Sequence, residues 1–230
     1  MSTRAWSLRT QPAILGGSAT NHGRRRRSSM EYQMKRPIIT VLLATVVALP
    51  AFAALKQGDA APDFSAQASL AGKAFAFSLA DARRHGPVVV YFYPAAFTEG
   101  CNVQAHEFAV KMEKFQAAGA TVIGVSLDNI NRLNAFSADP HYCAGKVPVA
   151  SDTNGKIAHS FHLNIDPAEL GFKDTRGVEV GHGFAERTTF IVSSDGIIAA
   201  TIGGLAPATN VDRALAVVQR LAAAGQTTAK

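Results

Sequence analysis

The clearest hydrophobic pattern in the chain is a run of six apolar residues at 88–93, Val-Val-Val-Tyr-Phe-Tyr, which ends at Pro94. A continuous run of β-branched and aromatic residues predicts a central strand that is buried on both faces of a sheet. From Cys101 onward, apolar positions recur at spacings of four and three until Gly119, which predicts a helix with one apolar face. Cys101 lies on that face in the first turn, and Thr98 is placed to cap the helix.

Shorter patterns predict further strands and helices in alternation. Runs at 65–70 and 74–79, on either side of a turn at 71–73, predict a hairpin. The segment 164–186 is polar and Gly-rich without a clear period, so we expect a long loop there. This order predicts a single α/β domain over residues 54–230, with helices on both faces of the sheet. The remaining strands are expected at 121–127, 147–150, 188–193 and 197–202, and the remaining helices at 129–137, 155–163 and 211–223.

The first 53 residues have a different pattern and are not expected to belong to this domain. Residues 34–53 contain Met-Lys-Arg-Pro, an apolar run at 38–49 and the ending Pro-Ala-Phe-Ala, the three regions of a secretory signal. A membrane anchor over 38–55 is the alternative, but the run is short for a bilayer and ends in a small-residue cleavage pattern. Residues 1–33 are rich in Arg and Ser without periodicity, so they indicate disorder or a start codon upstream of the true one. We therefore expect cleavage after Ala53 and export, in a bacterium to the periplasm.

The basic charge of the whole chain is concentrated before the predicted cut. Eight of the 23 Lys and Arg residues, but only one of the 17 Asp and Glu residues, precede residue 54. The remainder carries 15 basic and 16 acidic residues, so it has no excess of basic charge with which to bind nucleic acid. We expect no nucleic-acid partner, and no membrane association after signal cleavage.

The two cysteines, Cys101 and Cys143, both lie in the part predicted to be exported, where disulfides persist. They could form a structural bridge or a redox pair, or one could be a nucleophile and the other a bystander. The start of a helix favours the thiolate form of Cys101, because free N–H groups and the helix dipole stabilise the anion. Arg187 precedes a predicted strand, and strand ends adjoin helix N-termini in α/β sheets, so its guanidinium could reach this sulfur.

Residues 94–101 read Pro-Ala-Ala-Phe-Thr-Glu-Gly-Cys, and this Pro-x-x-x-Thr-x-x-Cys pattern resembles the active-site loop of peroxiredoxins. The resemblance runs in order from Gly58 to the end of the chain. The segment 58–64, Ser151-Asp152 and the segment 187–196 are similar to other landmarks of the family. Gln104 stands where the bacterioferritin-comigratory (PrxQ) subgroup of the AhpC/TSA superfamily often carries Gln or Glu.

This resemblance implies a thioredoxin-like fold with a central mixed sheet, and a thiol-dependent peroxidase that reduces hydrogen peroxide and small organic hydroperoxides. It assigns Cys101 as the peroxidatic cysteine, which becomes a sulfenic acid, and Thr98 as the residue that hydrogen-bonds the peroxide. Pro94 would shield the site from water, and Arg187 would stabilise the thiolate and the transition state. The resemblance implies no cofactor and no metal.

The second thiol departs from the subgroup's commonest arrangement. A resolving cysteine often lies five residues after the peroxidatic one, and that position is His106 here. Other members carry it after the next strand, in the following helix; Cys143 lies just past Asp139-Pro140 in a comparable place, which makes it the candidate for an intramolecular disulfide with Cys101. The resemblance also implies a thioredoxin-like or glutaredoxin-like reductant, and we expect a monomer or a weak homodimer.

Two other functions fit the same fold. An exported thiol–disulfide oxidoreductase is expected to contain Cys-x-x-Cys, whereas Gln104 stands three residues after Cys101. A non-catalytic thioredoxin-like module would instead hold Cys101 and Cys143 in a structural disulfide. His159 and His162 have the spacing of metal ligands on one helix face, but no third ligand accompanies them in the sequence.

Overall fold

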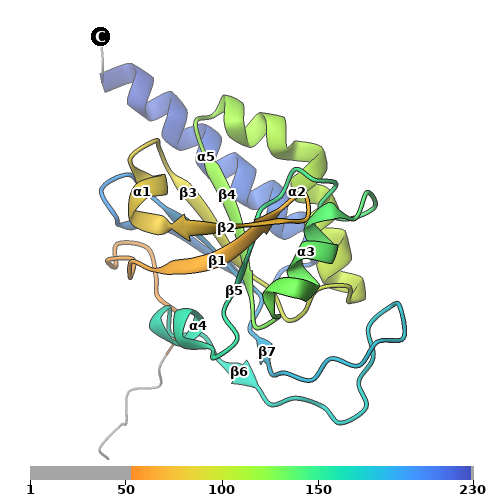
Figure 1. Ribbon diagram of the computed structural model, residues 1–230. Coiled ribbons are helices and arrows are strands. Elements are labelled where there is room, and N and C mark those ends of the chain that lie inside the picture. Colours follow the sequence, from red (N-terminus) through yellow and green to blue (C-terminus); the bar gives the residue numbers. More distant parts are fainter. Residues whose placement is uncertain (1–52, 229–230) are drawn as a thin grey trace, which may run out of the picture. The chain divides into compact units, whose positions relative to one another are not determined.

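The central sheet has seven strands in the order β2-β1-β5-β4-β3-β8-β9 (Figure 1), within a computed structural model that describes residues 53–228. β3 pairs in parallel with β4, and β4 pairs in parallel with β5. The pairs β1–β2, β1–β5, β3–β8 and β8–β9 are antiparallel. The sheet is therefore mixed, as predicted. Its strands are β1 (Ser65–Leu70), β2 (Lys73–Ser78), β3 (Val88–Phe92), β4 (Thr121–Ser126), β5 (Val149–Ser151), β8 (Thr188–Val192) and β9 (Ile198–Gly203).

Helices cover both faces of the sheet. The long helices α2 (Glu99–Ala117) and α5 (Pro207–Thr228) run side by side on one face, which α3 (Ile130–Ala138) also covers. The short helices α1 (Leu79–Arg83) and α4 (Lys156–Ser160) contribute to the core of the other face. Side chains alternate along a strand, so Val89 and Tyr91 of β3 pack toward α2, while Val88 and Val90 pack toward the opposite core. Every residue of β3 is consequently buried, which explains its continuous apolar sequence.

Several elements differ from the sequence-based prediction. Helix α1 was not predicted, because its five residues are too few for an apolar period; it begins where Ser78 accepts a hydrogen bond from the Asp81 N–H at 3.2 Å. Helix α5 begins four residues earlier than predicted, at Pro207, whose fixed φ suits the first position of a helix. The predicted loop at 164–186 forms a small antiparallel sheet at its two ends, from β6 (Ile165–Asp166) and β7 (Phe184–Ala185).

The predicted signal segment, residues 34–53, lies almost wholly outside the described residues. Across residues 53–228, no helix is both long enough and apolar enough to cross a membrane.

Candidate active site

Cys101 lies in the first turn of α2, directly after the loop that leaves β3, and its side chain is buried. Thr98 occupies the N-cap position, but its hydroxyl donates to the Ala95 carbonyl at 2.8 Å and makes no capping bond to the helix. The prediction that this side chain caps α2 is therefore wrong, because the hydroxyl takes a partner in the preceding loop. The hydroxyl oxygen still has lone pairs that can accept a hydrogen bond. Pro94, at the start of the loop, is partly exposed.

Arg187 brings a fixed positive charge to Cys101. Because β8 runs antiparallel to β3, with Thr188 opposite Phe92, the residue before β8 lies where β3 leads into the loop of Cys101. From there, Nη2 of Arg187 donates to Sγ of Cys101 at 3.3 Å. Gly100 leaves room for this contact, since a Cβ at residue 100 would lie 3.2 Å from Nη2.

A buried chain of hydrogen bonds orients the Arg187 guanidinium. Its Nη1 donates to Oε1 of Gln104, whose Nε2 donates to Oδ1 of Asn210 in α5 at 3.2 Å. The same Asn210 oxygen accepts from the Thr189 hydroxyl at 2.6 Å, and Asn210 Nδ2 donates to the Ile202 carbonyl at 3.1 Å. Asn210 thereby determines which way the Gln104 amide faces, so that its oxygen meets the arginine. Asn210 could not be identified from the sequence, because a single Asn beside an amphipathic helix carries no signal of its own.

Cys143 is fully buried in the segment that follows α3, and neither cysteine forms a disulfide. Burial raises the pKa of the Cys143 thiol, and the nearby carboxylate of Asp139 raises it further. Burial likewise raises the pKa of Tyr91, with further contributions from both Cys143 and Cys101. Tyr91 and the two thiols belong to the same buried cluster on the α2 side of the sheet. The segment of Cys143 also contacts α2 directly, where Nδ1 of His106 lies 3.0 Å from the His141 carbonyl.

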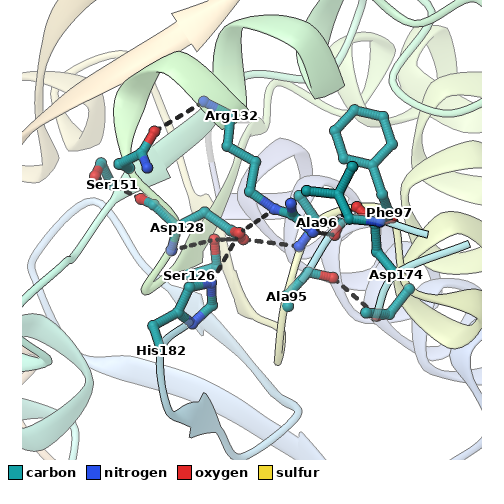
Figure 2. Close-up of polar contacts among 12 residues, drawn as sticks. Ala95, Ala96, Phe97, Ser126, Asp128, Arg132, Ser151, Asp174 and His182 are labelled. Carbon is teal, nitrogen blue, oxygen red and sulfur yellow. Dashed lines mark hydrogen bonds and ion pairs between the residues drawn. The ribbon is translucent and has the colours of Figure 1, made fainter. Parts of the chain in front are cut away.

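The loop between β3 and α2 is held at Ala96. Its N–H donates to Oδ2 of Asp128 at 2.7 Å, and its carbonyl accepts from Nη2 of Arg132 at 2.8 Å. Asp128 lies just after β4, the strand next to β3, and Arg132 lies in α3, which follows β4. The loop is therefore fixed by residues that come directly after the neighbouring strand (Figure 2). Neither residue could be recognised from the sequence as part of the site.

Comparisons with known proteins agree with this geometry. The model of the AhpC/TSA family matches residues 57–201. Peroxiredoxin Q of Populus jackii, a chloroplastic protein, is 31% identical over 171 residues, which are 74% of this chain and 71% of the relative. The putative peroxiredoxin bcp of Helicobacter pylori is 31% identical over 144 residues, which are 63% of this chain and 85% of the relative.

Solved structures of peroxiredoxins have the same fold. Peroxidoxin BcpB of Mycobacterium tuberculosis superposes with a TM-score of 0.60 at 26% identity, covering 72% of this chain and 97% of that protein. The bacterioferritin comigratory protein of Xanthomonas campestris, whose structures concern alkyl peroxide reduction, gives a TM-score of 0.55 at 26% identity, covering 74% and 99%. Since the family model spans more than half of the chain and these folds agree, the chain belongs to the AhpC/TSA family and is a peroxiredoxin, a thiol-dependent peroxidase of thioredoxin-like fold.

Proposed function

We propose that Cys101 is the peroxidatic cysteine and that it reduces hydrogen peroxide and small organic hydroperoxides. The observation that carries this proposal is the 3.3 Å contact between Arg187 Nη2 and Cys101 Sγ at the start of α2. A cation and free helix N–H groups stabilise a thiolate, which is the nucleophilic form of cysteine. The thiolate attacks the terminal peroxide oxygen, the O–O bond breaks, and Cys101 becomes a sulfenic acid, while the departing hydroxide or alkoxide takes a proton from solvent and leaves as water or an alcohol.

The neighbouring residues support this reaction. Arg187 is placed to stabilise negative charge as it develops on the departing oxygen, an effect that is strong in a buried site. The Thr98 hydroxyl donates to Ala95 and retains acceptor capacity, so it is suited to receive a hydrogen bond from the peroxide O–H. Pro94 has no N–H and limits water access on its side of the loop.

We propose that a hollow over the first turns of α2 receives the organic group of a hydroperoxide. It has a volume of about 340 Å³ and is lined by Asn102, Val103, His106, Glu107, His141 and Tyr142, so that it adjoins Cys101 in the chain through Asn102. Val103, two residues after Cys101, is 43% exposed and offers an apolar contact to an alkyl or aryl group. Val103→Ser should therefore slow the reaction with cumene hydroperoxide more than the reaction with hydrogen peroxide. Equal slowing of both reactions would argue against this surface as the organic subsite.

We further propose that Cys143 resolves the sulfenic acid. Its sulfur would attack Sγ of Cys101 and form an internal disulfide with release of water. The contact of His106 with His141 supports this pairing, because it holds the segment of Cys143 against α2. The burial and raised pKa of Cys143 mean that its thiol is a poor nucleophile in the reduced fold. Attack therefore requires the first turn of α2 or the segment after α3 to move.

Rapid-quench mass spectrometry tests both steps. After one equivalent of hydrogen peroxide, the wild type should lose two hydrogens as the Cys101–Cys143 disulfide forms. Cys143→Ser should instead gain one oxygen on Cys101, which dimedone would trap, and Cys101→Ser should remain unchanged. Failure of the wild-type Cys101 thiol to react would refute the peroxidase assignment. Oxidation without the internal disulfide would refute only the role of Cys143.

A thioredoxin-like or glutaredoxin-like protein is the reductant that we propose for this disulfide. Peroxiredoxins use thioredoxin-type reductants, and a disulfide within one chain is a suitable target for a dithiol protein. Peroxide-dependent NADPH consumption with a thioredoxin system, compared with a glutaredoxin and glutathione system, tests this proposal. We also propose a monomer or weak homodimer, which light scattering over a range of concentrations would test.

Export is the last part of the proposal. It is supported by the charged, apolar and small-residue regions of residues 34–53. N-terminal sequencing of the protein purified from an expressing bacterium should begin at Ala54, and the protein should fractionate with the periplasm. Retention of residues 34–53 in the mature protein would refute it.

A further inference from the structure

We infer that Asp128 is a positioning residue for the catalytic loop and that His182 binds it as an imidazolium cation, so that peroxide reactivity weakens when His182 loses this charge. The inference deepens the proposed peroxidase function and depends on it for its kinetic readout. It concerns a cluster of side chains, among them Asp128, Arg132 and His182, that contacts the loop before Cys101 at Ala96 (Figure 2).

The first step is the constraint on the loop backbone. Asp128 accepts from the Ala96 N–H at 2.7 Å, and Arg132 donates to the Ala96 carbonyl at 2.8 Å. The next residue, Phe97, has a φ of 63°, in the left-handed region that is unfavourable for a bulky side chain. Such a conformation persists only where the surroundings enforce it. Asp128 and Arg132 supply that constraint at Ala96, two residues before Thr98 and five residues before Cys101.

A second segment holds the same loop from outside. Both the N–H and the hydroxyl of Thr175 donate to the Phe97 carbonyl, at 2.9 and 2.7 Å. The Arg176 guanidinium lies over the Phe97 ring, 3.2 Å from its centroid. Asp174, whose side chain is fully buried, links the two anchors, since it accepts from Arg132 Nη2 and Arg176 Nη2 at 2.8 Å each. The catalytic loop is thus clamped between α3 and the segment that contains residues 174–176.

His182 closes this clamp at its far end. Its Nε2 lies 2.9 Å from Oδ1 of Asp128, and its Nδ1 lies 2.8 Å from the Gly183 carbonyl. A carboxylate and a carbonyl can only accept hydrogen bonds, whereas a neutral imidazole has a single N–H. Both contacts are satisfied together only when the ring carries two protons and a positive charge.

The electrostatic surroundings favour that charged form. Burial opposes the charge, but the hydrogen bond and the negative charge of Asp128 outweigh burial and raise the pKa of His182. Burial also disfavours ionised Asp128, yet its bonds to His182, Ala96 and Ser126 lower the pKa of that carboxyl. The other charged groups on the surrounding elements are Arg132 on α3 and Arg176 and Glu179 on the segment before β7, which line one hollow of about 510 Å³ with His182.

The expected pH dependence follows from the sign of the shift. Below the raised pKa of His182, the imidazolium donates a charge-assisted hydrogen bond to Asp128. Through Asp128, the segment before β7 is then linked to the loop at Ala96. As pH rises through that pKa, one of the two ring contacts loses its proton. The clamp on Ala96 then weakens, so that the geometry of Thr98 and Cys101 is less well defined.

The test compares His182→Gln with the wild type by rapid-quench measurement of Cys101 oxidation. Because both proteins contain the same Cys101 and Arg187, the ratio of their rates isolates the contribution of His182. At about pH 6 the wild type should react about tenfold faster, and the ratio should fall toward one as pH rises through the raised pKa of His182. His85→Gln is the matched control, because His85 is exposed just before β3, at the strand end opposite the site, and its ratio should stay near one throughout.

A ratio for His182→Gln that does not change with pH would overturn the inference, since a merely structural role would give a constant deficit. In an Asp128→Asn background, adding His182→Gln should change the rate little at any pH. An undiminished effect there would also overturn the inference. ¹⁵N NMR of the His182 ring separates the inference from the proposed function: two protonated nitrogens at about pH 6 are expected without any peroxide, and one would refute the charged clamp.

Discussion

Nη2 of Arg187 lies 3.3 Å from Sγ of Cys101, although 86 residues separate them along the chain. The antiparallel register of β8 on β3 produces this proximity, because it places Thr188 opposite Phe92. The other guanidinium nitrogen, Nη1, is held by Gln104, so Nη2 is free to face the sulfur. The charge that the reaction needs is therefore positioned by the sheet and oriented by a side chain of α2.

Arg187→Met should slow the reaction of Cys101 with hydrogen peroxide by about 100-fold, the cost typical of losing one buried electrostatic donor. Arg187→Lys should recover only part of the rate, because an ammonium cannot donate in fixed directions to both Gln104 and Cys101. Second-order rate constants from rapid-quench alkylation measure both. Arg220→Lys, on the exposed side of α5, should match the wild type. A Lys variant as fast as the wild type would show that charge alone suffices.

Asn210→Ala should lower both stability and reactivity. The substitution leaves three buried groups without their hydrogen-bond partner: Gln104 Nε2, the Thr189 hydroxyl and the Ile202 carbonyl. Unpaired buried polar groups should lower the free energy of unfolding by roughly 1–3 kcal/mol, measured by urea denaturation. Because the Gln104 amide can then rotate, we also expect oxidation of Cys101 to slow by about tenfold, equivalent to roughly 1.4 kcal/mol.

Thr189→Val separates the two effects of Asn210. It removes one bond to the same Asn210 oxygen but leaves the bond from Gln104 in place. Stability should therefore fall, while the rate of Cys101 oxidation stays close to that of the wild type. Equal slowing in both variants would mean that Asn210 acts on the rate only through general packing.

The sequence predicts the parts of this site that follow from local patterns. The buried strand β3 and the apolar face of α2 are long enough to identify, and together they place Cys101 at a helix start. Arg187 can be inferred because the ends of strands meet helix starts in an α/β sheet. The hydroxyl of Thr98 could not be assigned, because it chooses between two local partners that only the loop conformation distinguishes.

The supporting residues could not be predicted, because each depends on a contact that is distant in sequence. Asp128 lies 32 residues from Ala96, His182 lies 54 residues from Asp128, and Asn210 lies 106 residues from Gln104. None stands in a repeating pattern. Their importance arises from the sheet order, which brings the ends of β4 and β3 together and sets α5 against α2.

Stability should fall as pH rises through the titration of His182. The pKa of His182 is raised in the folded state, so its contribution is fully present below the unfolded pKa and is lost above the folded one. The pKa of Asp128 is lowered, so its contribution is instead lost in acid, as pH falls through the folded value. Urea denaturation of the wild type from about pH 6 to about pH 9 should show a decline that His182→Gln lacks. Parallel declines in both proteins would assign the effect to other groups.

Tyr91→Phe should leave the protein as stable as the wild type or stabilise it by about 1 kcal/mol, because the buried Tyr91 hydroxyl has no hydrogen-bond partner among the described residues. The ring would keep its stacking on Phe108, at 4.3 Å between centroids.

Gly124→Ala should lower the free energy of unfolding by roughly 1–3 kcal/mol, because the added Cβ would lie 2.5 Å from Cζ and 2.6 Å from the hydroxyl oxygen of Tyr91. Combining Gly124→Ala with Tyr91→Phe should recover part of that loss, because the clash with the Tyr91 hydroxyl disappears. Gly181→Ala is the control: no atom lies within 4 Å of its added Cβ, so its effect on stability should be nearly neutral. Thermal and urea denaturation measure all four variants. A clear loss of stability in Tyr91→Phe would mean that a bound water or one of the two nearby thiols satisfies the hydroxyl, and the phenol would then belong with the site of Cys101.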